Sequence, residues 1–114
     1  MRTLLVSILM FCTFNTYAAD GYVEGLGTKT CDEVMTGMEK KEPSQQDVIN
    51  WTLGYFSGAN VAHALHSRRD VTAGSAILTD RLMSLVKAKC AERPDYLLSK
   101  AVYEVYFELR TAGQ

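Results

Sequence analysis

The sequence of 114 residues has no excess of charge of either sign and no long hydrophobic run. Its 12 lysines and arginines face 13 aspartates and glutamates, whereas nucleic-acid-binding domains carry a clear basic excess. The one apolar run, near the N-terminus, is shorter than the roughly 20 residues that a membrane-spanning helix requires. We therefore expect neither a nucleic-acid partner nor a membrane span.

Redox and metal-binding patterns are also missing. The three cysteines form no C-x-x-C pair, and the two histidines, His63 and His66, have no third histidine or cysteine beside them. A spacing of three on a helix can share a metal ion, but two solvent-facing histidines at a helix end explain the pair more simply. The sequence therefore predicts no metal and no cofactor.

No catalytic group of residues emerges either. Ser57 lacks the glycine-rich elbow and the oriented acid that a nucleophilic serine requires. Glu104 and Glu108 fall on the outer surface of a helix, whereas glycoside hydrolysis needs two carboxylates that face each other across a cleft. We therefore expect a protein that is not an enzyme.

The first 18 residues resemble a secretory signal peptide. Arg2 provides the positive start, residues 4–11 form the apolar centre, and Ala18 ends a small-residue cleavage site. Cys12 follows Phe11 rather than the small residue that a lipid-attachment site needs. We therefore expect cleavage after Ala18, no lipid anchor, and a mature protein in the periplasm.

The mature chain keeps two cysteines, Cys31 and Cys90. An even number of cysteines in an oxidising compartment predicts a disulfide, and two cysteines allow only one pairing. The bridge would close a loop of about 60 residues, which chain-entropy estimates value at about 4 kcal/mol. Residues 19–29 include three glycines and predict a flexible N-terminal arm, whereas residues 30–112 predict one helical domain.

Helical periodicity and capping signals divide this domain into four helices, and no segment has the alternation of a strand. Thr30 and Glu33 fit a capping box, Ser44 caps the second helix, and Pro94 stands where the fourth begins. We expect helices at about 31–40, 44–66, 75–92 and 95–110. The predicted fold is all-α, a single small orthogonal bundle of four helices with one disulfide.

The helix at 44–66 has two apolar stripes, which indicates a central helix covered on both sides. One stripe comprises Val48, Trp51, Tyr55, Ala62 and Leu65, and the other comprises Ile49, Leu53 and Phe56. Gly54 and Gly58 lower helix stability, so we expect another helix backbone to approach them closely. Five residues of this helix are predicted to be packing residues: Trp51, Gly54, Tyr55, Gly58 and Asn60.

Two pairs of residues are candidates for a partner surface. Tyr103 and Phe107 lie one turn apart on the side of the last helix away from its apolar stripe, with Tyr106 beside them. They form either a second core layer under the N-terminal arm or a protein or homodimer interface. Arg68 and Arg69 lie in a polar turn, where they are either solvated or in contact with an acidic partner.

Two segments together resemble a known family. Thr30–Met35 is a T-C-acid-acid-hydrophobic helix start, and Leu85–Pro94 carries the second cysteine before an amphipathic last helix. With Trp51 between them, they resemble the HdeA/HdeB group of small periplasmic acid-stress chaperones, over about residues 30–109. The segment 51–60, W-x-x-G-Y-x-S-G-x-N, departs from those chaperones and is similar to the central helix of Rap1a/Tai-type immunity proteins.

The resemblance implies a four-helix, one-disulfide periplasmic protein that loosens at low pH and holds unfolded client proteins. In physical terms, carboxylates with a depressed folded pKa would stabilise the fold until acid protonates them. The similarity to immunity proteins implies an alternative, a binding module that stays folded and neutralises one secreted toxin or enzyme.

Overall fold

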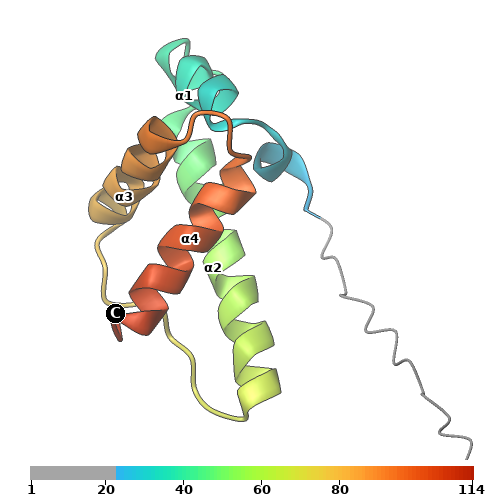
Figure 1. The fold of residues 1–114 in the computed structure, drawn as a ribbon, viewed down its shortest axis with the longest axis vertical. Helices are drawn as coiled ribbons and strands as arrows, with labels where there is room; N and C mark the ends of the chain where they lie inside the picture. Colours follow the sequence, from blue (N-terminus) through green and yellow to red (C-terminus); the bar gives the residue numbers. More distant parts are fainter. Residues whose placement is uncertain (1–22) are drawn as a thin grey trace, which may run out of the picture.

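The computed structural model describes residues 23–114, and this part of the chain folds into four α-helices and one short 3₁₀ helix without a named strand (Figure 1). The expected signal peptide lies outside the described residues. The elements in chain order are η1 (Gly25–Thr28), α1 (Cys31–Glu39), α2 (Gln45–Ser67), α3 (Thr79–Glu92) and α4 (Leu98–Thr111). The predicted all-α fold is confirmed.

Capping boxes begin α1 and α2. The Thr30 hydroxyl accepts a hydrogen bond from the Glu33 amide at 3.2 Å, and the Glu33 carboxylate accepts one from the Thr30 amide at 2.7 Å. Ser44 and Asp47 repeat the arrangement at the start of α2, at 3.1 and 2.9 Å. These contacts satisfy amides that have no partner inside a helix, which fixes both starts where the sequence predicted them.

The predicted disulfide between Cys31 and Cys90 is present, and both cysteines are buried. It joins the first residue of α1 to the last turn of α3 across 59 positions of sequence. The bridge therefore closes a covalent loop that contains the whole of α2.

The central helix is α4, not α2 as the two apolar stripes predicted. In Figure 1, α4 crosses the middle of the molecule, and it packs against η1, α1, α2 and α3. Six of its residues are buried: Leu98, Ala101, Val102, Val105, Tyr106 and Leu109. In contrast, α2 buries one side only, through Val48, Ile49, Thr52 and Phe56.

Two residues of the predicted apolar stripes are instead exposed, Leu53 at 42% and Leu65 at 77%, and Leu78 is exposed at 80%. Leu65 lies on the side of α2 away from its buried residues, whereas Leu53 lies about a third of a turn around the helix from Leu65. Leu78 precedes α3 as its N-cap residue. The two predicted stripes therefore do not correspond to a covered and an uncovered side of α2, because Val48 of one stripe and Ile49 and Phe56 of the other are all buried.

Helix α4 begins three residues later than predicted, at Leu98 rather than residue 95, because the backbone of the segment before it caps another helix. The Cys31 amide donates to the Tyr96 carbonyl at 2.7 Å, and the Asp32 amide donates to the Pro94 carbonyl at 3.0 Å. These carbonyls satisfy the first free amides of α1. Residues 94–97 are therefore committed to a non-helical path beside the disulfide.

The end of the expected flexible arm is packed against α2. Gly27 is buried, and the Trp51 indole nitrogen donates to the Glu24 carbonyl at 3.2 Å. A Cβ at Gly27 would lie 2.7 Å from the Trp51 ring carbon Cη2, so only glycine fits. Residues 23–29 are thus part of the folded domain rather than a loose extension.

Candidate binding surface

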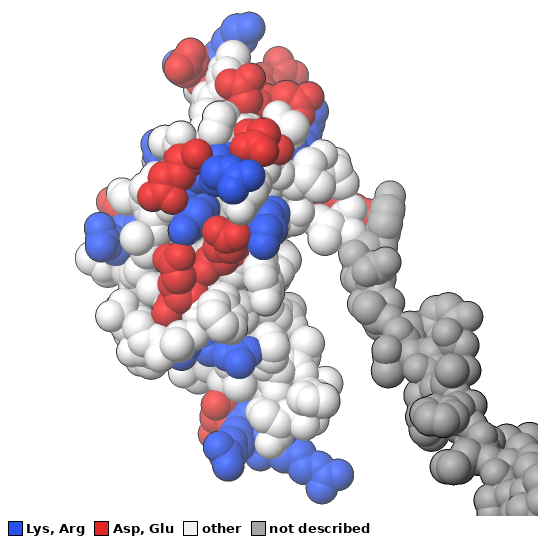
Figure 2. Space-filling view, viewed as in Figure 1, with Lys and Arg blue, Asp and Glu red and all other residues white. Residues whose placement is uncertain are grey.

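The outer side of α2 is an uncharged, largely apolar surface. No lysine, arginine, aspartate or glutamate occurs from Val48 to Ser67. Val61 and Leu65 are exposed at 59% and 77%. In Figure 2, charged side chains are spread over the half of the molecule that carries α1, and a second group lies at the opposite tip, with mostly uncharged surface between the two. We call Trp51, Gly54, Gly58, Val61, Ala62 and Leu65 the α2 outer face.

Gly54 and Gly58 lie in the α2 outer face, and the predicted close approach of another helix backbone is wrong. A Cβ at either position would have no heavy atom within 4 Å. The two glycines instead form the floor of a groove of about 540 Å³, which Trp51, Tyr55 and Ala62 also line. Their small size creates open space on the surface of the described chain.

Trp51 and Tyr55 form one wall of this groove. Both side chains are partly buried, and their ring centroids lie 5.7 Å apart. Burial raises the pKa of the Tyr55 hydroxyl, and the neighbouring Tyr103 and Tyr106 raise it further. The two rings are therefore held as a fixed aromatic edge beside the glycine floor.

Tyr103 and Phe107 remain half exposed on the flank of α4, at 44% and 50%. Their rings stack with centroids 6.3 Å apart. The described residues thus do not bury this pair as a second core layer. Tyr106, which was expected to flank the same surface, is instead 1% exposed and belongs to the core.

Asn60 connects α2 to two other parts of the fold. Its side-chain amide donates to the Ala73 carbonyl at 3.1 Å, and its side-chain oxygen accepts the Tyr106 hydroxyl at 3.0 Å. These two hydrogen bonds give Asn60, one of the five predicted packing residues, a structural role. Its two partners could not be identified from the sequence because they lie 13 and 46 positions away.

The two histidines near the end of α2 differ in their surroundings. His63 stacks on Tyr106 with centroids 5.8 Å apart, and its Nδ1 lies 2.9 Å from an Arg110 guanidinium nitrogen, whereas His66 is exposed. Burial, followed by the charges of Arg110 and His66, lowers the pKa of His63. Across residues 23–114, no group of three or more histidine, cysteine or acidic side chains is placed to hold a metal ion.

Arg68 and Arg69 lie in the turn that follows α2, and both are exposed. Arg68 adopts the left-handed conformation that ends the helix, with φ of 54°. Tyr103 and Phe107 lie on α4, whereas Arg68 and Arg69 follow the last residue of α2. The two predicted partner-surface pairs are therefore separate features, on α4 and at the tip of α2.

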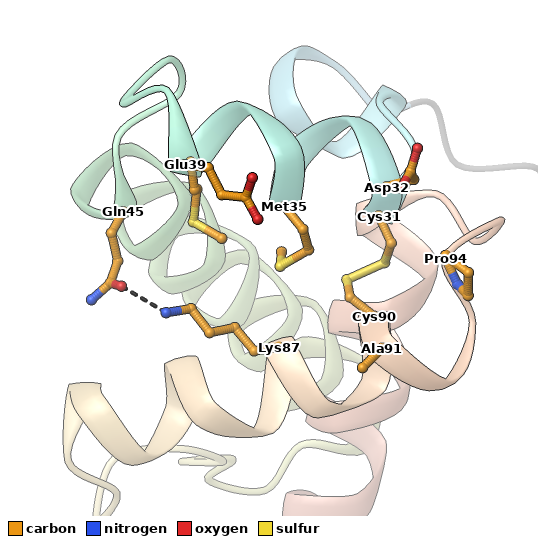
Figure 3. Close-up of a pocket in the computed structure, with 10 residues that line it drawn as sticks. Cys31, Asp32, Met35, Glu39, Gln45, Lys87, Cys90, Ala91 and Pro94 are labelled. Atoms are coloured by element: carbon orange, nitrogen blue, oxygen red, sulfur yellow. Dashed lines mark hydrogen bonds between the residues drawn. A yellow bond between two sulfur atoms is a disulfide. The ribbon is translucent and has the colours of Figure 1, made fainter.

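A second hollow, of about 550 Å³, lies between α1 and α3 beside the disulfide (Figure 3). Met35 and Met38 line it from α1, and the Cys31–Cys90 bridge closes one end. At its rim, the Lys87 ammonium donates to the Gln45 side-chain oxygen at 2.8 Å. The hollow is lined by sulfur and aliphatic groups with a polar rim, a combination that suits an apolar side chain better than a reacting group.

Ion pairs join α3 to α4 on the surface. The Lys89 ammonium lies 2.8 Å from Glu108 and 3.7 Å from Glu104, so these two glutamates are not simply solvated. The hydrogen bond to Glu108 raises the pKa of Lys89, and Lys100 lowers the pKa of Glu104. This cluster is the main electrostatic connection between the two helices.

No protein-family model, curated protein or solved structure gives a significant match to this sequence. Within residues 23–114, the helices are too short or too polar to cross a membrane. What can be said of function therefore rests on the surfaces just described.

Proposed function

We propose that the mature chain is a non-enzymatic periplasmic protein that binds unfolded proteins during acid stress. The observation that supports this proposal is the uncovered α2 outer face, where Val61 and Leu65 are exposed beside an aromatic-walled groove. Exposed apolar patches on soluble proteins commonly mark binding sites for other proteins. An uncharged surface of this kind suits the apolar segments that unfolded clients expose.

Acid would loosen the fold at defined points. The pKa values of Glu33 and Asp47 are lowered by hydrogen bonds from Thr30 and Ser44, respectively. A carboxylate with a depressed folded pKa stabilises the fold above its unfolded pKa, and this stabilisation is lost as the pH falls through the folded pKa. The starts of α1 and α2 therefore weaken in acid, as does the contact of Glu104 with Lys100.

The covalent bridge limits how far this loosening can go. Cys31 and Cys90 keep α1 attached to α3 when the capping boxes and ion pairs fail. At pH 2–3 carboxylates are largely protonated, whereas the lysines and arginines of the chain stay charged. The resulting net positive charge would keep the loosened protein and its clients in solution.

The test is light scattering of an unrelated enzyme that unfolds and aggregates at pH 2–3, with and without the mature protein. The proposal expects suppressed aggregation at pH 2–3 and little effect at pH 7. A failure to suppress at any molar ratio, or a protein whose circular dichroism and α2 exposure stay unchanged down to pH 2, would remove it.

A second candidate function is specific binding of one partner, as by an immunity protein or inhibitor. The stacked pair Tyr103 and Phe107 favours it, because the two rings are already exposed on a rigid helix in the folded state. Aromatic side chains commonly anchor protein interfaces. Affinity capture from a periplasmic extract at neutral pH distinguishes the two functions, since a single stoichiometric partner supports this one and many weakly held clients support the first.

A further inference from the structure

We propose that the α2 outer face packs against the same face of a second copy of the chain, with the two α2 helices antiparallel and a twofold axis at Gly58. The proposal concerns the folded protein at neutral pH, so it stands or falls separately from acid-stress binding. It explains why apolar residues such as Val61 and Leu65 are exposed on α2, at 59% and 77%, away from the residues that the described chain buries.

An axis at Gly58 pairs residues that are equally distant from it along α2. Gly54 then faces Ala62 of the second copy, Tyr55 faces Val61, and Trp51 faces Leu65. Each pair joins either two small residues or one aromatic and one aliphatic residue. Val61 and Leu65 of one copy, which are exposed at 59% and 77%, would therefore project towards the groove over Gly54 and Gly58 of the other copy.

Charge favours a second copy over an unrelated partner. In a twofold interface, each residue near the axis approaches its own equivalent, so a charged residue there would face a like charge. The stretch from Val48 to Ser67 has none, although charged residues make up 22% of the whole sequence. The central part of α2 is therefore suited to contact the same segment of a second copy.

The ends of α2 carry complementary charges in the same register. Asp47, in the first turn of α2, is the same distance from Gly58 along the sequence as Arg69, in the turn that follows the helix. An antiparallel pair therefore brings the start of one α2, with Asp47, towards the turn that follows the other α2, which holds Arg68 and Arg69 as well as Asp70. Antiparallel alignment also places opposite ends of the two helix dipoles side by side, which is favourable.

The size of the surface sets the expected affinity. Stable interfaces commonly bury about 800 Å² on each partner, and one helix face with its flanking groove is at the small end of that range. We therefore expect a reversible dimer with a dissociation constant of about 1–10 μM.

Sedimentation equilibrium of the mature protein at pH 7 tests the dimer. We expect a monomer–dimer equilibrium that Gly58→Leu weakens about 10- to 100-fold, since a bulky side chain at the axis overpacks the contact. A Cβ at position 58 would have no heavy atom within 4 Å, so the new side chain starts in open space in the monomer; circular dichroism of the variant checks that its helical fold is kept. Ala88→Leu, at an exposed position on α3, is the matched control and should leave dimerisation unchanged.

Cysteine cross-linking tests the register itself. Gly58→Cys should form a covalent dimer on mild oxidation because the two copies of residue 58 meet at the axis. Gly54→Cys and Ala62→Cys should each fail alone but cross-link when mixed. Mass spectrometry should confirm that the Cys31–Cys90 bridge is retained in every variant.

Three results would overturn the proposal. The first is a monomer at all concentrations up to about 100 μM, well above the expected dissociation constant. The second is a dimer that Gly58→Leu does not weaken, which would place the interface elsewhere. The third is cross-linking of Gly54→Cys or Ala62→Cys alone without cross-linking of Gly58→Cys, which would exclude this axis.

Discussion

The Tyr106 hydroxyl donates a hydrogen bond to the Asn60 side-chain oxygen at 3.0 Å, and this contact ties the central helix α4 to α2. Asn60 passes the connection on through its amide to the Ala73 carbonyl at 3.1 Å, in the loop before α3. Tyr106 also packs edge-on against Phe56, with centroids 5.1 Å apart. The hydrogen bond between Tyr106 and Asn60, with apolar packing beside it, thus fixes the position of α2 against α4.

Tyr106→Phe should lower the free energy of unfolding by about 1–2 kcal/mol. The substitution removes the Tyr106 hydroxyl and keeps the aromatic packing, so the Asn60 side-chain oxygen loses its hydrogen-bond donor. Urea denaturation followed by circular dichroism measures the change. Tyr103→Phe, on the exposed flank of the same helix, is the control, and an equal loss in both variants would contradict a specific role for the bond.

The sequence predicted those parts of the fold that depend on neighbouring residues. Thr30 and Ser44 each cap a helix through a residue three positions later, so both helix starts were predicted correctly. The pairing of Cys31 with Cys90 followed from cysteine count alone. The start of α4 was missed because the carbonyls of Pro94 and Tyr96 cap α1, a contact between segments more than 60 positions apart.

The candidate surface was predicted less well, for a physical reason. Apolar periodicity does not tell which residues of α2 another helix covers: Ile49 and Phe56 of one predicted stripe are buried, whereas Leu53 of the same stripe is exposed. Tyr103 and Tyr106 show the same limit, because residues three apart on one helix turned out half exposed and fully buried, respectively. Their different exposure follows from the packing of α2 on α4, which buries Tyr106 and leaves Tyr103 on the flank.

Removal of the disulfide should destabilise the protein by about 4 kcal/mol, because the bridge closes a long loop in the unfolded chain. The Cys31→Ala, Cys90→Ala double variant avoids a free thiol and tests this directly. The loop between the cysteines spans 59 positions. Chemical denaturation at pH 7 gives the loss, and a change below about 1 kcal/mol would contradict the entropic account.

The glycines should respond in opposite ways to substitution by alanine. Gly74 has φ of +81°, and its Cβ would lie 2.6 Å from Phe56, so Gly74→Ala should be strongly destabilising. Gly54 lies in the open surface of α2, so Gly54→Ala should stabilise the folded monomer by about 0.5–1 kcal/mol. Thermal unfolding at a concentration where the protein is monomeric compares them. Destabilisation by Gly54→Ala would show that its surroundings are closed.

Acid stability should depend on the capping carboxylates. The pKa of Glu33 is lowered chiefly by its hydrogen bond from the Thr30 backbone, so its stabilising effect is complete above the unfolded pKa of about 4.3 and is lost as pH falls through the lower folded value. Glu33→Gln can keep the capping box but cannot titrate. Its urea midpoint should therefore fall less steeply than that of the wild type between pH 5 and pH 2. Glu39→Gln, which removes one charge from the other end of α1, is the control, and parallel curves for Glu33→Gln and the wild type would contradict the mechanism.

The His63 pKa should lie below the ordinary value of about 6.5, because burial disfavours the imidazolium and Arg110 repels it. The stabilising effect of neutral His63 is present above its unfolded pKa and is lost as pH falls through the lower folded pKa. NMR titration of the ring protons measures it. Arg110→Gln should move the pKa back towards the ordinary value, and an unchanged titration in that variant would show that Arg110 does not act on His63.

The central claim is that the α2 outer face is a protein-binding surface, and one comparison tests it most directly. Leu65→Ser and Leu78→Ser remove equivalent leucines that are 77% and 80% exposed, the first on the α2 outer face and the second before α3. In the client-aggregation assay at pH 2–3, the account predicts that Leu65→Ser weakens the suppression seen with the wild type, whereas Leu78→Ser leaves it intact. Equal suppression by both variants would contradict the claim.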